Sequence, residues 1–331
     1  MTRALTRKTP WKRFLQRSGT RTALVLLGTV VALSLAAPAL PIPLPSDMNA
    51  AAASHSPELN WQQANSISLK ELESSHPFAA SIRRSLFGSR ELAGLLGTDD
   101  LGRDLLSRVL WGGRVSLLVG LIASLVSALV GVSWGVVAGY RGGRLDQFMM
   151  RLVDIGYSIP FLFVVILLIA VLRNDELASH MRSAGLNRIS VLYLVIGGIS
   201  WLTMARIVRG QVLSIRKAPY VAAAQALGAR GTRIVRCHIL PNLWGIIVVY
   251  LTLTVPRVML FEAFLSFLGL GVEPPGVSWG ILASEGLESL TVLGVSWWMV
   301  VFPGLALAIT LGTLNSLGDA LRDALDPRLS R

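Results

Sequence analysis

Six stretches of the chain are apolar over most of their length and long enough to cross a lipid bilayer. A membrane-spanning helix needs roughly 20 mostly apolar residues to cover about 30 Å of hydrocarbon. The stretches are rich in Leu, Val, Ile, Ala and Gly, without the period-two alternation of a barrel strand. Backbone groups in lipid must bond within their own segment, so the pattern predicts helices. The six predicted spans are residues 22–43, 115–139, 152–172, 190–208, 244–270 and 295–317.

Basic residues are distributed unevenly among the segments that join these spans. The chain has 31 Lys and Arg against 19 Asp and Glu, a formal net charge of +12. With the N-terminus placed in the cytoplasm, most of the Lys and Arg fall on the inner side, as the positive-inside rule requires. We therefore predict an all-α polytopic membrane protein with six transmembrane helices and both termini cytoplasmic. The charge is assigned to topology, and no nucleic acid is expected as a partner.

This topology divides the chain into five parts. The first outside loop is too short for a sizeable core of its own, and its polar residues 54–76 are expected to be loosely ordered. The first span also resembles a secretory signal peptide, but its long basic region and the prolines after it favour an uncleaved helix. The parts are a cytoplasmic segment 1–21, the first helix 22–43, an extracytoplasmic loop 44–114, a transmembrane core 115–317 containing a large inner loop 209–243, and a cytoplasmic tail 318–331.

Residues that carry chemistry are sparse. The one cysteine, Cys237, allows no disulfide within the chain, and no two of the four histidines lie at helical metal-ligand spacing. No lysine follows a glycine, so the Gly-Lys of a phosphate-binding P-loop is absent. We therefore expect no metal site, no catalytic residue and no cofactor bound by this chain.

The inner loop is the most informative segment. Pro219 suits the first turn of a helix, and the Ala-rich stretch from Tyr220 to Leu227 continues it. Gly228 can end this helix, and a second short helix over residues 232–240 is expected to stop at Pro241. The loop is then either an ordinary helix-turn-helix with positive-inside charge, or a short helix that docks into a groove on a soluble partner and transmits its motion.

The first of these helices is expected to carry an apolar stripe. Val221, Ala224 and Leu227 are assigned to one stripe along the helix. Small side chains that permit close approach of a partner are added by Ala222, Ala223 and Ala226.

The segment YVAAAQALGA, followed by ILPN, resembles the "EAA" loop of binding-protein-dependent importer permeases. In that family this loop forms the coupling helices, which insert into the nucleotide-binding subunits. The family's Glu falls on Ala222 here, which puts in doubt any salt bridge that the Glu would make, although Ala keeps the helix. The resemblance implies that the ATPase-coupling residues are Tyr220, Val221, Ala222, Ala223, Ala224, Ala226, Leu227, Gly228, Leu240 and Pro241.

Three further stretches narrow the resemblance. LGTDDLGRDLLSRVLWGGRVSL (96–117), FEAFLSFLGLGVEPPGVSWG (261–280) and LGDALRDALDPRL (317–329) resemble the C-type permeases of dipeptide and oligopeptide importers. Four motifs in matching order and spacing are far more specific than any one alone. The resemblance covers about residues 96–329, and the region 44–95 has no match.

The resemblance implies a type I ABC importer permease architecture in the bacterial inner membrane. It also implies the partners: a second homologous permease, two ABC ATPase subunits that use ATP, an extracytoplasmic solute-binding protein and membrane lipid. The implied substrate is a dipeptide or oligopeptide. Nickel or another small solute remains an alternative, because related systems carry these.

Charged residues near the membrane are candidates for the substrate path or a gate. Asp99 and Asp100, which follow Thr98, can cap a helix start, or can belong to the outer gate or to the docking site for the solute-binding protein. Arg257 and Glu262 lie in or near the fifth span, rotated from each other by roughly 140°, so we expect each to pair across helices or with the second permease. Lining the substrate path is the alternative. The candidates are Asp99, Asp100, Arg103, Arg257 and Glu262.

Two other classes of protein compete with this interpretation. A secondary transporter or channel independent of ATP would need ion-coupling carboxylates near the bilayer midplane, often on inverted repeats. The middles of the spans are nearly free of charge, and no repeat is evident. A membrane-embedded enzyme would need a cluster of reactive side chains at membrane depth, which the spans do not offer.

Smaller features give local expectations. Pro160 lies in the third predicted helix, where it would kink the helix. Arg151 and Asp154 are three residues apart and are expected to form a local ion pair. An aromatic belt at the outer interface is expected from Trp279, Trp297 and Trp298.

Overall fold

The computed structural model describes residues 14, 18–160, 162–164, 166–167, 183, 188–271, 276–291 and 294–325. They form two compact units. Unit 1 contains the described parts of Met1–Thr22, Gly120–Val258 and Leu314–Arg331. Unit 2 contains Ala23–Val119 and the described parts of Met259–Thr313.

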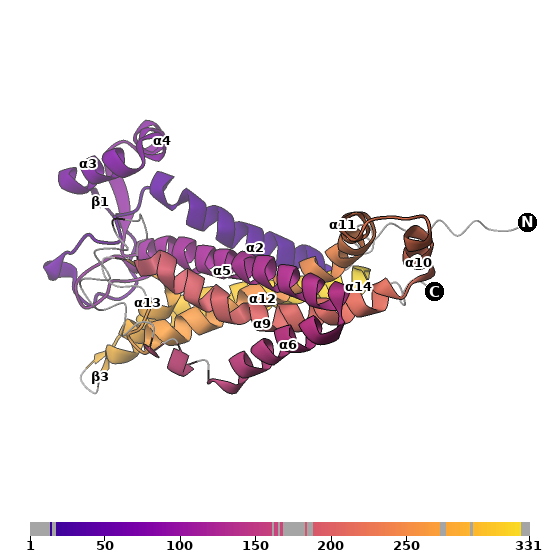
Figure 1. Cartoon of the computed structure of the whole chain (residues 1–331). Coiled ribbons are helices and arrows are strands. Elements are labelled where there is room, and N and C mark those ends of the chain that lie inside the picture. Colours follow the sequence, from indigo (N-terminus) through magenta and orange to yellow (C-terminus); the bar gives the residue numbers. More distant parts are fainter. Residues whose placement is uncertain are drawn as a thin grey trace, which may run out of the picture. The chain divides into compact units, whose positions relative to one another are not determined.

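Four long helices contribute residues to both units (Figure 1). Within the described ranges, these four are the helices long and apolar enough to cross a membrane, the first together with the short 3-10 helix η1 (Ala37–Ala39) and the third together with the helical residues that precede it from Gly231 onward. They correspond to the first, second, fifth and sixth spans predicted from the sequence. The four are α2 (Ser18–Ala36), α5 (Leu105–Arg141), α12 (Leu240–Phe267) and α14 (Trp298–Leu325).

The third and fourth predicted spans have different outcomes. The fourth lies within α9 (Arg188–Arg216), a helix of 29 residues. The third, 152–172, is interrupted, because α6 (Gly143–Ser158) ends ahead of Ile159, whose backbone is extended. A continuous helix through Pro160 is therefore wrong, since a residue that precedes proline is driven out of the helical conformation. Much of the rest of that span lies outside the described residues.

In unit 1, α5 and α9 approach each other closely along a line of glycines. Gly131, Gly135 and Gly139 are four residues apart, so they share one face of α5. A Cβ added at any of them would come within 2.6 to 2.8 Å of atoms of α9. Small residues at such spacing let two membrane helices pack backbone to backbone.

Two ion pairs connect α6 to α9 in the same unit. Asp146 binds Arg209 through both carboxylate oxygens, at 2.9 and 2.6 Å. Asp154 binds Arg206 at 2.6 Å. The expected local pair between Arg151 and Asp154 is therefore wrong, because α9 packs beside α6 and brings an arginine to the carboxylate from another helix.

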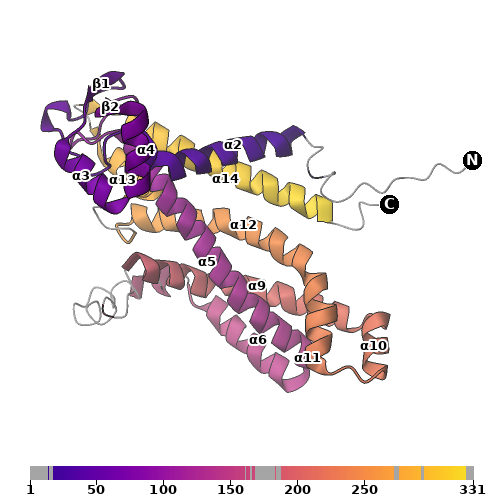
Figure 2. The same ribbon diagram turned by 90° about the horizontal axis from the view of Figure 1, so that it is seen from above.

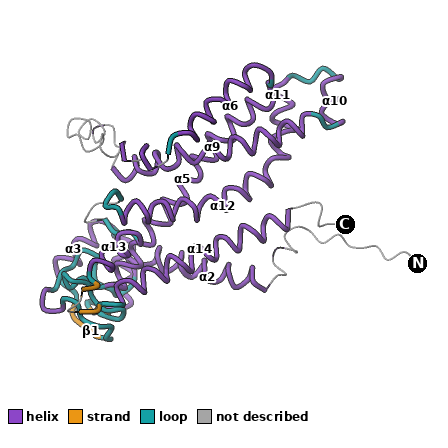
Figure 3. The backbone as a smooth tube through the Cα atoms, turned by 90° about the horizontal axis from the view of Figure 1, so that it is seen from below, coloured by secondary structure: helices purple, strands orange, loops and turns teal. Residues whose placement is uncertain are grey.

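In unit 2, the segment that joins α2 to α5 is folded. Leu44, Leu72 and Ala80 form a small core. The expectation that residues 54–76 are loosely ordered is wrong, because Asn65 caps a helix there and Ser68 bonds to Asp47, which holds that helix on the core. Loops and strands gather in this region (Figure 3). Its elements are η2 (Ala50–Ala52), β1 (Asn60–Gln63), α3 (Ser66–Ser75), α4 (Pro77–Phe87) and β2 (Arg90–Ala93), with β1 and β2 antiparallel and Asn60 opposite Ala93.

Smaller elements of unit 2 lie between α12 and α14 in the sequence. They are α13 (Trp279–Glu288) and an antiparallel pair of two-residue strands, β3 (Leu290–Thr291) and β4 (Gly294–Val295). The sequence predicted an all-helical fold, so neither the β1–β2 pair nor the β3–β4 pair was expected.

The outer aromatic belt is wrong for two of its three tryptophans. Trp279 and Trp298 are buried in unit 2, whereas Trp297 is exposed. The indole N–H of Trp279 donates to the carbonyl of Val109 at 2.8 Å, and that of Trp298 donates to the carbonyl of Thr98 at 3.0 Å. With their polar atoms satisfied, these rings serve as core residues.

Candidate functional site

The inner loop of unit 1 folds as short helices between α9 and α12 (Figure 2). The first is α10 (Pro219–Ala226), which forms where the alanine-rich sequence predicts it. After a turn come α11 (Gly231–Ile234) and η3 (Val235–Ile239), a π-helical turn. The loop therefore presents α10 as a separate short helix.

The end of α10 depends on Gly228. This residue has φ of +79°, a conformation that side chains with a Cβ rarely adopt. Its N–H donates to Gln225 O at 2.9 Å, and the next N–H, of Ala229, donates to Ala224 O at 3.0 Å. This pair of bonds is a Schellman motif, which satisfies the last carbonyls of the helix.

Pro241 does not end the second helix, contrary to the sequence prediction. The helical backbone continues from Gly231 to Phe267, and Leu240 and Pro241 form the first residues of α12. The π-helical turn gives the physical reason. Leu240 N–H donates to Val235 O, five residues back, and this wider turn accommodates a proline ring that would otherwise clash with the carbonyl four residues before it.

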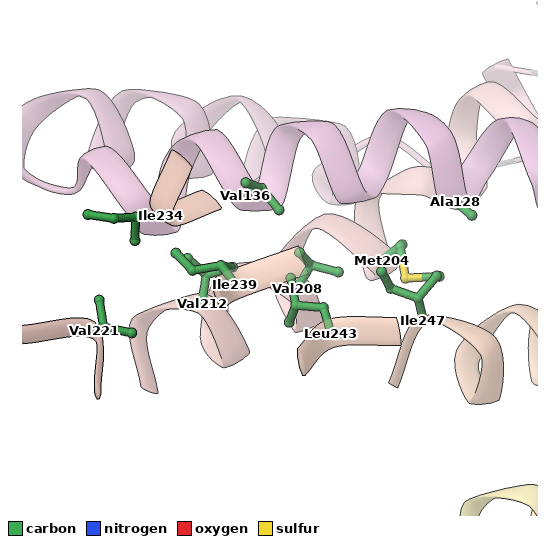
Figure 4. Packing of buried hydrophobic residues seen from close by; sticks show 10 residues of the cluster. All are labelled: Ala128, Val136, Met204, Val208, Val212, Val221, Ile234, Ile239, Leu243 and Ile247. Atoms are coloured by element: carbon green, nitrogen blue, oxygen red, sulfur yellow. The ribbon is translucent and has the colours of Figure 1, made fainter. Parts of the chain in front are cut away.

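A single buried side chain fixes α10 to the rest of the unit. Val221 is the buried residue of this helix, and its side chain is fully enclosed. It belongs to a cluster shared by α5, α9, α11, η3 and α12 (Figure 4). The cluster comprises Ala128, Val136, Met204, Val208, Val212, Val221, Ile234, Ile239, Leu243 and Ile247.

The opposite face of α10 is exposed and apolar. Leu227, just after the helix, is 89% exposed. The single stripe predicted for Val221, Ala224 and Leu227 is therefore wrong, because six residues of helix leave Leu227 roughly 120° away from Val221 around the helix axis. The outward surface, called the free face below, consists of Ala222, Ala223, Ala226 and Leu227.

The surroundings of this face are cationic. Residues 206–243 contain no Asp or Glu. Tyr220 is exposed beside the ring of His238, at 6.2 Å between centroids. A surface of this sign attracts an acidic partner. The exposed basic residues around α10 are Arg216, Lys217, Arg230, Arg233 and Arg236.

Two of the candidate gate residues belong to a buried ion network in unit 2. Asp99 accepts the backbone N–H groups of Leu101 and Arg103, and its other oxygen binds Arg103 Nε and Arg108 Nη1, each at 2.6 Å. Arg108 is 1% exposed and also makes two contacts with Glu285 on α13, one of them 3.2 Å between Nη2 and Oε1. The network joins the start of α5 to α13.

Sequence reasoning missed half of this network. Arg108 lies inside a stretch that carries the family resemblance, but nothing local distinguishes it from a surface arginine. Glu285 is 177 residues further along the chain, so no spacing rule connects them.

Asp104 acts as the cap at the start of α5. Its carboxylate accepts the N–H groups of Ser107 and Gly94, both at 2.7 Å. Burial raises the pKa of Asp104 above its ordinary value, while these two N–H donors act in the opposite direction.

The other three candidates for the path or gate lie elsewhere. Asp100 is exposed and accepts a hydrogen bond from Ser54 at 2.7 Å. Arg257 is exposed in unit 1. Glu262 is buried in unit 2, where Ser266 donates to it at 2.7 Å and Ser116 at 3.4 Å. Within unit 2, the network of Asp99 and Arg103 therefore includes neither Asp100 nor Glu262.

The residues that the structure describes hold no group of three His, Cys, Asp or Glu side chains placed to bind a metal ion. The described part of the inner loop presents an exposed apolar helix face surrounded by basic side chains.

Comparisons with known proteins identify the family of the chain. The family described as "Binding-protein-dependent transport system inner membrane component" matches residues 131–331. The dipeptide transport system permease protein DppC of Bacillus subtilis is 47% identical over 235 residues, covering 71% of this chain and 69% of the relative. The oligopeptide transport system permease protein OppC of Salmonella typhimurium is 49% identical over 232 residues, covering 70% of this chain and 72% of the relative.

A solved structure shows a similar fold. It is a chain of the MetNI methionine ABC transporter in an inward-facing conformation, which matches with a TM-score of 0.51 and 20% sequence identity. The match covers 66% of this chain and 96% of that chain. At this identity the likeness concerns the fold alone.

Proposed function

This chain belongs to the family of binding-protein-dependent transport system inner membrane components, and from this premise we propose that it is the permease subunit of an ATP-driven peptide importer. It is a multi-pass protein of the bacterial inner membrane. It forms half of the translocation path and couples that path to ATPase subunits on other polypeptides. The free face of α10 is the observation that carries this coupling role.

The free face has the properties of a docking surface for an ATPase subunit. Three alanines leave the backbone accessible, and Leu227 projects beyond them. The helix is joined to the unit by Val221 at the opposite side, so a force applied to the free face reaches α9 and α12 through one packed cluster. Such a contact can transmit motion in both directions.

Ala222 stands where the family has Glu, which alters the expected contact. This chain cannot make a salt bridge from that position. Apolar packing of Leu227 and attraction between the surrounding arginines and an acidic rim on the ATPase subunit take its place.

The assembly follows from family membership. A second, homologous permease completes the path, two ABC ATPase subunits bind the coupling loops, and an extracytoplasmic solute-binding protein delivers the substrate. Six transmembrane helices with both termini cytoplasmic place α10 on the ATPase side. ATP binding draws the ATPase subunits together, α10 moves with them, and the helices alternate between outward and inward access.

Peptides are the proposed cargo. The support is the similarity to permeases named for dipeptide and oligopeptide transport over about seven tenths of the chain. This chain holds no ATP site in the proposal, which assigns ATP hydrolysis to the partner subunits.

Purification of the tagged chain from detergent-solubilised membranes tests the coupling role. We expect a P-loop ATPase and a second permease to co-purify, and ATP-dependent uptake of a labelled dipeptide after reconstitution. Gly228→Pro should abolish co-purification of the ATPase and ATP-dependent uptake, because proline fixes φ near −65° where +79° is needed. The matched control is Gly228→Asn, since Asn tolerates this conformation, and it should retain ATPase binding. Purification of the chain alone, with solute movement that needs no ATP, would overturn the proposal. ATP-dependent nickel uptake without peptide uptake would overturn the assignment of the cargo.

A further inference from the structure

Helix α4 lies where the first membrane span ends. It packs against η1, which directly follows α2 and forms the last part of that span. In Figures 1 and 2, α4 lies beside this end of α2 and crosses its direction, whereas α3 lies farther away. A helix that lies across the end of a span is placed to run along the surface of the bilayer if it carries an exposed apolar side.

One face of α4 is fixed to the folded part of unit 2. Ala80 packs with Leu44 and Leu72 in the small core. Arg83 is 4% exposed and binds Glu91 at 3.1 Å and the carbonyl of Ile42 at 3.0 Å. These contacts set the rotation of α4 about its own axis, so the direction of its other faces is determined.

One exposed side of α4 is apolar. Phe78 is 78% exposed and Leu86 is 69% exposed, and the partly buried Ile82 lies between them at spacings of four residues. Glu73 of α3 binds Arg84, which lies on a different side of α4. The apolar side therefore points away from the contact between α3 and α4.

Exposed apolar side chains are also present on α2, the helix that precedes η1. Near η1, Leu33 and Leu35 on α2 are exposed, the latter by 64%. Exposed apolar side chains of a membrane span face lipid or another transmembrane helix. Phe78 and Leu86 add exposed apolar surface on a helix that packs at the end of this span.

We propose that α4 is an interfacial anchor whose Phe78, Ile82 and Leu86 insert into the phospholipid leaflet that surrounds η1. The ligand is the boundary between headgroups and acyl chains. The anchor holds the region between α2 and α5 against the membrane in a fixed orientation, with Arg83 as the residue that sets the angle of insertion.

Quenching by labelled lipids tests this in the full chain reconstituted into phosphatidylethanolamine–phosphatidylglycerol nanodiscs. Cys237→Ser removes the one cysteine, and Ser85→Cys places an environment-sensitive fluorophore beside Phe78 without removing an anchor residue. The matched control is Glu71→Cys, an exposed position on α3. Lipid carrying a nitroxide near its headgroup should quench the label at residue 85 several-fold more than the label at residue 71, and iodide should do the reverse.

A second comparison removes the anchor without changing the buried side of α4. Phe78→Ser with Leu86→Ser should shift the label at residue 85 towards quenching by iodide. Equal quenching at residues 85 and 71 would overturn the proposal, because α4 would then lie in water. Protection of residue 85 from both lipid and iodide would also overturn it, because a protein would then cover the face. None of these outcomes depends on the cargo or on the ATPase.

Discussion

Arg108 is a buried cation held between carboxylates from distant parts of the sequence. Replacing it by methionine would keep most of the volume but leave Asp99, 1% exposed, with one cation fewer. Breaking one partner out of a buried pair costs about 3–5 kcal/mol. We expect Arg108→Met to lower the free energy of unfolding by about this amount, measured by denaturation of the purified full chain in detergent.

The control for this prediction is Arg84→Met, whose arginine is exposed in its pair with Glu73. Exposed pairs contribute about 0–1 kcal/mol, so this variant should unfold close to the unaltered protein. Equal losses from the two variants would show that the buried network contributes nothing specific.

His76 gives a prediction for acid. Burial, and the positive charge of Arg114 second, lower the pKa of His76 below 6.5. The fold therefore prefers the neutral ring, which accepts a hydrogen bond from Arg114 at 3.5 Å. The stability that the neutral ring contributes is present above pH 6.5 and is lost as the pH falls through the lowered pKa of His76. We expect acidification to increase hydrogen exchange in α3 and α4.

His76→Gln isolates this effect, because Gln can accept the same bond and has no charge to gain. The variant should show a weaker increase of exchange on acidification than the unaltered protein. The comparison is needed because burial raises the pKa of Glu91 in the same region. A raised carboxyl pKa stabilises the fold on acidification, which is opposite to the effect of His76. Identical pH dependence in the two proteins would contradict the role of His76.

Single residues show where sequence reasoning ends. Gly228 was identifiable because a turn after an alanine-rich helix needs a residue free to adopt positive φ, and the structure has that turn. Trp279 was misplaced, because a tryptophan near a membrane boundary suits the interface until its N–H finds a buried carbonyl. Glu285 gave no signal, since its meaning depends on Arg108, a partner supplied by the tertiary fold.

At the scale of elements, apolar runs predicted the long helices well and their interruptions poorly. The runs that became α2, α5, α12 and α14 are long and nearly free of charge, and length with hydropathy suffices for those. The predictions made from two prolines were wrong in opposite ways. Pro160, predicted inside a helix, follows the end of α6, and Pro241, predicted to end a helix, lies inside a continuous one. The helix continues through Pro241 because a π-helical turn precedes it, and the spacing of apolar residues in the sequence does not reveal such a turn.

Helix α10 allows its two faces to be separated by mutation. Val221→Ala leaves a cavity in the cluster, and we expect a loss of about 1–3 kcal/mol in the free energy of unfolding. Leu227→Asp changes a side chain that is 89% exposed, so the stability of the isolated chain should change little while binding of the ATPase subunit is lost. Denaturation and co-purification, measured on both variants, give the two readouts. If both variants still bind the ATPase subunit, α10 is not part of the interface.

At the scale of the whole molecule, labelling of single cysteines tests the predicted number of membrane crossings between α5 and α12. Six spans place Cys237 in the cytoplasm and residues 44–114 outside. Both positions are suited to labelling, since Cys237 and Ser74 are exposed. A hairpin of α6 and α9 that enters and leaves the membrane on the inner side would give the same two results, because it adds no net crossing. A third position, between those two helices, is needed to distinguish the models.

Ser179 supplies that position, because six spans place residues 173–189 outside, whereas an inner hairpin places them inside. With Cys237 as the one cysteine, we expect a membrane-impermeant maleimide to label the chain in inverted vesicles and not in intact spheroplasts. In the Cys237→Ser background, Ser74→Cys and Ser179→Cys should both be labelled in spheroplasts. Labelling of Ser179→Cys from the inside alone would contradict six spans while leaving α10 cytoplasmic. Labelling of Cys237 in spheroplasts would place α10 on the wrong side of the membrane for any ATPase and would remove the coupling role altogether.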